Sequence, residues 1–277
     1  MQVGLIGCGN MARALARGWG RPLLCADPIA ERALSLAAEI GGEALATNAQ
    51  VAERAELVVL CHKPLQLEEV AREIAPHARA VASILAATPL AALKAAYPER
   101  PVYRFIPSLP VEVRQGAIVQ AADALRADAL AADGPQSSTG KSRDTSPGGD
   151  QSRPSFDSSV RELFAELGRL VVLPDALLDA AMGLMSCAPA YVALITEAQV
   201  DAGVSHGIPA PQGAELVVQT LAGTAELLRS RGYDTLAVRR EVTSPGGATA
   251  RGLSALERAG LRSAFTDALD AVLGGGA

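Results

Sequence analysis

The chain has 277 residues, enough for two domains of ordinary size, and its 49% hydrophobic content can fill two cores. A net charge of −5 argues against nucleic acid and anionic membranes as partners, because both attract clustered Lys and Arg. The three histidines lack zinc-ligand spacing and the four cysteines form no CxxC pair, so no metal site is predicted, and reduced thiols in the cytoplasm are expected.

The first elements follow the pattern of a dinucleotide-binding βαβ unit. A short apolar strand (residues 2–6) leads into the turn GCGNMA, a helix (11–19) and a second strand (23–26). The turn needs glycine because backbone N–H groups at the start of the helix must approach a pyrophosphate. The alternative is a purely structural turn. The residues predicted to bind the cofactor here are Gly7, Gly9, Asn10, Met11 and Ala12, with Ala12 in place of the third glycine.

Asp27 follows the second strand at close to the spacing of ~20 residues where an acid binds the ribose 2′-OH of NAD(H) and repels the 2′-phosphate of NADP(H). The alternative is that Asp27 caps the helix that begins near Pro28. The predicted cofactor is therefore NADPH or NADH, and Asp27 favours NADH. The opening segment has no basic n-region and no stretch reaches ~18 uninterrupted apolar residues, so neither a signal peptide nor a membrane span is expected.

The strands that follow are almost entirely apolar and alternate with helices, which is typical of a parallel sheet covered on both faces. Helices are expected over residues 29–40, 48–54, 65–75 and 89–96, and strands over 57–61, 80–85 and 102–106. The pattern breaks at Ala121, and residues 133–155 are predicted to form a disordered surface insertion because they are rich in Ser, Gly, Asp and Pro. A helix and a last strand within 160–174 complete a Rossmann-like domain over residues 1–174.

From Asp175 the pattern is helical, and residues 175–277 are expected to form an all-α domain. Ala and Gly dominate its apolar faces, so a homodimer is expected to complete its core. In this domain the segment VTSPGGATARGL (Val242 to Leu253) places a Pro-Gly-Gly corner at the start of a helix. The same TSPGG letters occur at residues 145–149, so the pentapeptide alone is not evidence of a site.

Five segments together resemble the pyrroline-5-carboxylate reductase family. They are GCGNMA, CHKP (61–64), RFIPSLP (104–110), APAYVALITEAQVDAG (188–203) and VTSPGGATARGL. The resemblance covers nearly the whole chain apart from the 133–155 insertion. It implies an NAD(P)H domain, an intertwined helical dimer, often in a ring of dimers, and reduction of Δ1-pyrroline-5-carboxylate to L-proline, the last step of proline biosynthesis.

The resemblance also implies roles for individual residues. The corner would bind the carboxylate of a small imino acid through backbone N–H groups, with the hydroxyl of Thr249 near the ring nitrogen, unless the corner is only a helix cap. Asn48 and Lys63 would bind the ribose and phosphates of the cofactor, unless they are an N-cap and a solvated side chain. The predicted substrate-binding residues are Ser244, Pro245, Gly246, Gly247, Ala248 and the catalytic Thr249, and the further cofactor-binding residues are Asn48, His62, Lys63 and Pro64.

The chain departs from the family pattern at His62, Ala87, Ser108–Leu109 and Cys187–Ala188. These departures leave two alternatives open, a reductase of a different cyclic imine or related substrate and a non-catalytic nucleotide-binding homologue. Arg104 is expected either to orient a loop beside the nicotinamide or to form a surface charge pair.

Overall fold

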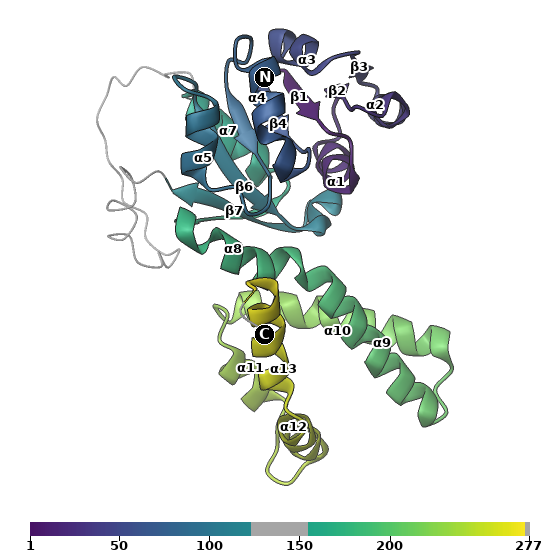
Figure 1. Ribbon diagram of the computed structural model, residues 1–277. Helices are drawn as coiled ribbons and strands as arrows, with labels where there is room; N and C mark the ends of the chain where they lie inside the picture. The colour runs from purple at the N-terminus through teal and green to yellow at the C-terminus, as the bar shows by residue number, and fades with distance from the viewer. Residues whose placement is uncertain (123–154, 275–277) are drawn as a thin grey trace, which may run out of the picture. The chain divides into compact units, whose positions relative to one another are not determined.

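The computed structural model describes residues 1–122 and 155–274, which divide into two compact units, Met1–Ser186 and Cys187–Ala277 (Figure 1). Residues 133–154 of the expected insertion, with the first TSPGG, lie outside the described residues. The division falls after Ser186 rather than after Pro174, because α8 (Leu178–Ala181) and the π-helical turn Met182–Ser186 pack against strands of the first unit.

The first unit is built on an eight-stranded sheet with the order β3-β2-β1-β4-β5-β6-β7-β8. The strands are β1 Val3–Ile6, β2 Leu24–Ala26, β3 Glu43–Ala44, β4 Leu57–Leu60, β5 Val81–Ser83, β6 Val102–Pro107, β7 Gly116–Ala122 and β8 Gly168–Pro174. Strands β1 to β6 are parallel, as predicted, whereas β7 pairs antiparallel with β6 and parallel with β8. The Rossmann-type order places the carboxyl ends of β1, β2 and β4 side by side, where such folds bind nucleotides.

Helices cover both faces of this sheet (Figure 1). Alternate side chains of β4 enter opposite cores: Leu57 and Val59 pack on one face, and Val58 and Leu60 on the other. On the first face lie α1 Asn10–Trp19, α2 Ala30–Ile40 and α7 Phe156–Ala165, and on the second lie α3 Asn48–Arg54, α4 Leu67–Ile74 and α5 Leu90–Ala96. The helices predicted from the sequence are thus confirmed to within a turn at each end.

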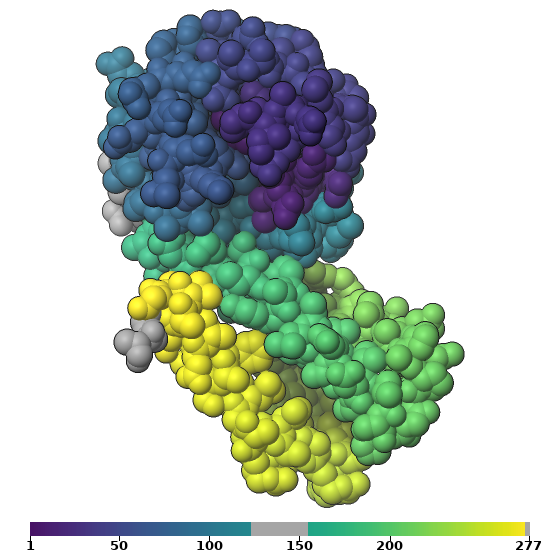
Figure 2. Space-filling model, turned by 45° about the vertical axis from the view of Figure 1, so that its right-hand side comes forward, coloured from purple at the N-terminus to yellow at the C-terminus, as the bar shows by residue number. Residues whose placement is uncertain are grey.

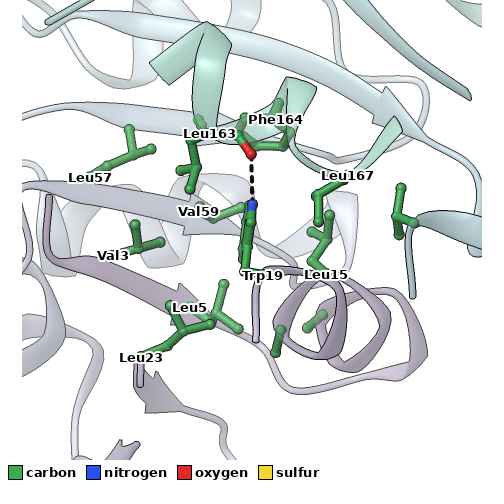
Figure 3. Packing of buried hydrophobic residues seen from close by; sticks show 14 of the residues in the cluster. Val3, Leu5, Leu15, Trp19, Leu23, Leu57, Val59, Leu163, Phe164 and Leu167 are labelled. Carbon is green, nitrogen blue, oxygen red and sulfur yellow. Dashed lines mark hydrogen bonds between the residues drawn. The ribbon is translucent and has the colours of Figure 1, made fainter. Parts of the chain in front are cut away.

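Trp19 fixes the far end of α1 in the core (Figure 3). Its indole Nε1 donates a hydrogen bond of 2.8 Å to the Leu163 carbonyl, and its ring meets Phe164 edge to face with centroids 5.6 Å apart. Phe164 in turn stacks on Phe105 of β6 at 3.8 Å. These contacts join α1, α7 and the sheet, so the glycine turn at the start of α1 is carried by a rigid element.

The second unit is entirely helical, as predicted. Its helices are α9 Ala188–Ser205, α10 Ala210–Ser230, α11 Thr235–Glu241, α12 Ala248–Arg258 and α13 Leu261–Val272. Helices α9 and α10 pack against each other (green in Figure 2), yet large apolar side chains such as Leu194 and Leu216 remain more than half exposed. Such faces are expected of a domain that completes its core with a partner chain.

By length and composition alone, residues Asp175–Ser205 could cross a membrane, with a mean hydropathy of 1.5. The stretch is not one continuous α-helix, because a 3₁₀ turn, α8 and the π-helical turn precede α9. A helix that exposes apolar side chains for a partner chain also meets this criterion of length and hydropathy. The stretch is therefore weak evidence for a membrane protein.

Candidate active site

The glycine turn between β1 and α1 is held tightly against β2 and β4. Gly7 has a φ of +93°, and a Cβ on it would lie 2.8 Å from backbone atoms of Cys61 and His62. The N–H of Gly7 donates to the Ala26 carbonyl at 2.8 Å, and the N–H of Cys8 donates to the Asp27 carboxylate at 2.7 Å. Only glycine fits at position 7 without strain, because φ is positive and the neighbouring backbone is in contact.

Gly9 is different, because it faces open space. In the part of the chain that the structure describes, nothing lies within 4 Å of a Cβ placed on Gly9, apart from its own chain neighbours. Gly9 is the N-cap of α1, and no described side chain caps this helix or adds an acid to its first turn. Free N–H groups at a helix N-terminus attract anions, so the turn fits the pyrophosphate of a dinucleotide.

The other predicted residues of the turn divide by burial. Asn10 is exposed and Met11 is half-buried, whereas Ala12 is buried against the sheet with 1% of its surface exposed. A residue larger than alanine at position 12 would separate α1 from the sheet, which explains why a small residue stands at the position of the third glycine.

A cavity of about 190 Å³ opens beside the glycine turn at the carboxyl ends of β1 and β2. The structure brings four of the predicted cofactor residues to its wall, namely Gly7, Asp27, Asn48 and His62. Glu69 and Glu73 of α4 also line it, and the sequence analysis missed both. The spacing of Glu69 and Glu73 could have indicated that they lie together, because residues four apart share one face of a helix.

Asp27 closes the turn from the end of β2. One carboxylate oxygen accepts the Cys8 N–H, and the other accepts the N–H of Ile29 at 2.8 Å. The N-cap of α2 is Ile29, so the alternative expectation that Asp27 caps this helix is wrong. A carboxylate has about four acceptor positions, so two stay available to a ligand in the cavity.

Asn48 starts α3, but the N-cap is Thr47, whose hydroxyl accepts the Gln50 N–H. The alternative expectation of an Asn48 cap is therefore wrong. The Asn48 side-chain amide donates to Glu73 at 2.7 Å, and the same carboxylate accepts the Ala49 N–H at 3.3 Å. Glu73 thus orients Asn48 at the cavity wall.

His62 presents an unsatisfied nitrogen at the same cavity. Its Nδ1 lies 2.9 Å from the Lys63 carbonyl, which requires the proton on Nδ1 and leaves Nε2 as an acceptor. Among the described residues, this buried Nε2 has no hydrogen-bond partner. Burial lowers the pKa of His62, so the ring is neutral at pH 7. An orphaned acceptor at the wall fits a ligand that donates a hydrogen bond.

Lys63 and Pro64 are exposed at the turn η1 (Pro64–Gln66), where the Lys63 N–H donates to the Gln66 side chain at 3.2 Å. Neither residue lines the cavity beside the glycine turn. Their part in cofactor binding stays a prediction.

Arg104 does not form the expected surface charge pair, and its part in orienting a loop beside the nicotinamide stays a prediction. Its side chain is 2% exposed, and its two terminal nitrogens each lie 2.8 Å from a carboxylate, that of Asp175 and that of Asp179. Asp175 also accepts the Leu90 N–H at the start of α5. Arg104 is therefore a buried clamp that ties the segment after β8 to β6, and the surface pair is wrong because the guanidinium is enclosed.

The Pro-Gly-Gly corner of the second unit opens α12. Gly246 has a φ of +70°, and a Cβ on Gly247 would lie 2.3 Å from the Ser244 hydroxyl oxygen. Gly247 is the N-cap of α12, and no side chain within the described ranges caps the helix. The corner therefore presents free N–H groups to solvent at Ala248 and Thr249, in a geometry that receives a carboxylate.

Three side chains frame this corner. The Thr249 hydroxyl is exposed in the first turn of α12, beside the free N–H groups. The Thr243 hydroxyl donates to the Arg239 carbonyl and is therefore committed to α11. Arg251, which the sequence analysis missed, donates to the Gly246 carbonyl at 2.8 Å and adds a positive charge. The corner therefore combines a helix N-terminus, a hydroxyl and a guanidinium, all suited to an anionic ligand.

Two of the departures from the family pattern have structural explanations. Ser108 is 3% exposed, and its hydroxyl accepts the Ala117 N–H at 2.9 Å, so this residue fixes β7 to the end of β6. Ala87 has a φ of +50°, a conformation that favours glycine, so the alanine at this position is strained.

We expect Ala87→Gly to raise the free energy of unfolding by about 0.5–1 kcal/mol, because it relieves the strain of a positive φ. The matched control is Ala86→Gly, next to it in the same exposed turn but with ordinary φ. This control should lower stability by a similar amount through the entropy of the unfolded chain. Urea unfolding followed by circular dichroism measures both, and stabilisation by both variants would contradict the explanation.

The fold and the open glycine turn define the class of protein, an oxidoreductase that uses a nicotinamide dinucleotide. Residues 2–87, which contain the turn and its cavity, match the family model described as NADP oxidoreductase coenzyme F420-dependent. Residues 175–274, which contain the helical unit and its corner, match the model described as pyrroline-5-carboxylate reductase dimerisation. A dimerisation domain accounts for the exposed apolar faces of α9 and α10.

Similarity over the whole chain gives the family. A pyrroline-5-carboxylate reductase from Thermus thermophilus is 33% identical over 282 residues, covering 98% of this chain and 95% of the relative. The crystal structure of 1-pyrroline-5-carboxylate reductase from Streptococcus pyogenes is similar with a TM-score of 0.80 and 25% identity, covering 98% and 96% of the two chains. The Plasmodium falciparum pyrroline carboxylate reductase with NADP bound has a TM-score of 0.79 at 22% identity, covering 98% and 95%. The chain belongs to the pyrroline-5-carboxylate reductase family.

Proposed function

We propose that the chain reduces Δ1-pyrroline-5-carboxylate to L-proline with NAD(P)H, the last step of proline biosynthesis. The observation that carries the proposal is the uncapped N-terminus of α12 at a Gly-Gly corner, in a chain of this family. A helix N-terminus of this kind suits the carboxylate of a small imino acid. The cofactor domain is assigned to residues 1–174 and the substrate and dimerisation domain to residues 175–277.

The corner holds and orients the substrate. Backbone N–H groups of Ala248 and Thr249 bind the carboxylate, and Ser244, Pro245, Gly246 and Gly247 shape the turn, with the Gly247 N–H donated to the Ser244 carbonyl. The Thr249 hydroxyl bonds near the ring nitrogen. Bound NAD(P)H supplies a hydride from C4 of its nicotinamide. A cyclic imine is readily protonated in water, so positioning contributes most of the acceleration and the chain needs no strong acid at the site.

The first unit holds the cofactor. The N-terminus of α1 would hold the pyrophosphate through the backbone of Gly7, Gly9, Asn10, Met11 and Ala12. Asp27 and Asn48 bind the adenosine ribose region, and the free Nε2 of His62 accepts a hydrogen bond there. Lys63 and Pro64 contact the ribose and phosphates from η1.

We infer further that the family's dimerisation domain forms homodimers, assembled into a ring of dimers. The ligand is a small molecule, and neither nucleic acid nor a membrane is a partner, in keeping with the net charge of −5. The cytoplasm is the proposed location.

The Thr249 hydroxyl provides the test. With purified protein and Δ1-pyrroline-5-carboxylate, loss of nicotinamide absorbance should be rapid. Thr249→Ala should cut kcat/KM roughly tenfold to a hundredfold, the value of a hydrogen bond to a charged group. Thr249→Ser keeps the hydroxyl and should restore most of the rate. An unchanged rate in Thr249→Ala would remove this residue from the site, and oxidation seen only with a six-membered cyclic imine would change the substrate.

A further inference from the structure

The cavity beside the glycine turn is acidic. Asp27, Glu69 and Glu73 all line it, and none of its lining residues, all of which are described, is Lys or Arg. Glu73 is bound to Asn48 and to the Ala49 N–H. The charged groups that face this end of the cofactor site are therefore all carboxylates.

The carboxylate of Asp27 is fixed in place rather than mobile. The N–H groups of Cys8 and Ile29 hold one oxygen each, and both bonds are shorter than 2.9 Å. Because each oxygen keeps a second acceptor position, the carboxylate can take hydrogen bonds from two neighbouring hydroxyls, as a ribose diol offers. A phosphate ester offers no such donors at neutral pH.

Among the described residues, no Lys or Arg lines this cavity to offset the charge. His62 is neutral at pH 7 because burial lowers its pKa. Arg13 is paired with Glu39, and Arg54 with Glu43. Arg32, in the first half of α2, and the exposed Lys63, next to His62, are the remaining cations close in sequence to the lining residues, and neither lines the cavity.

We propose that Asp27, helped by Glu69, makes this chain selective for NADH over NADPH. The proposal rests on the dinucleotide site proposed for the first unit. A 2′-phosphate carries about −1.5 to −2 charges at pH 7, and it would lie among carboxylates without a cationic partner. A free 2′-hydroxyl instead donates to Asp27.

The test measures the dissociation constants of NADH and NADPH by nicotinamide fluorescence, without substrate, on the full-length protein. We expect NADH to bind at least about tenfold more tightly. Asp27→Asn should reduce the ratio of the two affinities about tenfold to a hundredfold, because it removes the charge and weakens the ribose bonds. The steady-state kcat/KM ratio for the two cofactors should shift in parallel.

Asp27→Asn also changes the acceptor of the Cys8 and Ile29 N–H groups, so it could disturb the glycine turn itself. A second variant therefore tests the proposal if the affinities for NADH and NADPH fall together. Glu69→Gln makes no change to the turn and should tighten NADPH about two- to fivefold while NADH changes little. Glu68→Gln is the matched control, because it removes the same charge from the same helix at a position outside the cavity. It should leave both affinities unchanged.

Binding of NADPH as tight as that of NADH by the unmodified protein would overturn the proposal. So would a loss of affinity for NADPH but not for NADH in Arg32→Ala or in Lys63→Ala, since it would identify that cation as a partner of the 2′-phosphate. Selective NADH binding without turnover of Δ1-pyrroline-5-carboxylate would support the selectivity and contradict the proposed reaction. The two proposals are thus tested separately.

Discussion

Replacing Gly9 with valine should abolish NAD(P)H binding while the protein stays folded. Gly9 has ordinary extended backbone angles, with φ −74° and ψ −172°, and open space surrounds the position of its Cβ. The branched side chain is therefore accommodated, at a cost below about 1 kcal/mol for a poorer N-cap. The same side chain covers the free N–H groups of α1, which the pyrophosphate must reach.

The dissociation constant for NADH should rise more than about a hundredfold, the loss of several charge-assisted hydrogen bonds. Fluorescence titration measures this change, and thermal unfolding measures the fold. Gly7→Ala is the contrasting control, because a Cβ there meets the backbone of Cys61 and His62 at 2.8 Å. That variant should lose stability as well as binding. Normal cofactor affinity in Gly9→Val would show that the dinucleotide binds elsewhere.

Asp175→Ala should cause a large loss of stability in the first unit. The change removes one of the two carboxylates on buried Arg104 and leaves the Leu90 N–H at the start of α5 without its acceptor. Breaking a buried ion pair costs about 3–5 kcal/mol. Because Asp175 is itself 27% exposed, we expect the free energy of unfolding to fall by about 3 kcal/mol, the lower end of this range.

This loss should lower Tm by roughly 6–12 °C, and differential scanning calorimetry measures it. Asp179→Ala is the matched control, because Asp179 holds the other end of Arg104 but is 46% exposed. It should cost only about 1 kcal/mol, in line with the better solvation of that pair. Equal losses in the two variants would contradict the view that Asp175 is the main partner of the clamp.

The sequence was informative wherever function depends on neighbouring residues. The turn from Gly7 to Ala12, the Pro-Gly-Gly corner and the alternation of apolar strands with helices are local patterns, because each is set by a few consecutive residues. They were sufficient for the fold class and the family. Two strands were missed: β3, which has only two residues, and β7, which has seven.

Tertiary structure alone decided which distant side chains share a surface. Arg104 meets Asp175 and Asp179 only because β6 lies beside the segment that follows β8. Glu69 and Glu73 join Asp27 at one cavity because α4 begins at the edge of the sheet where β2 ends. Their charges act on one another across tens of residues of chain, and electrostatic interactions depend on distance in space rather than on separation in sequence. The sequence by itself therefore determined the fold and the kind of reaction, while the charge around the cofactor site was determined by the packing of strands and helices.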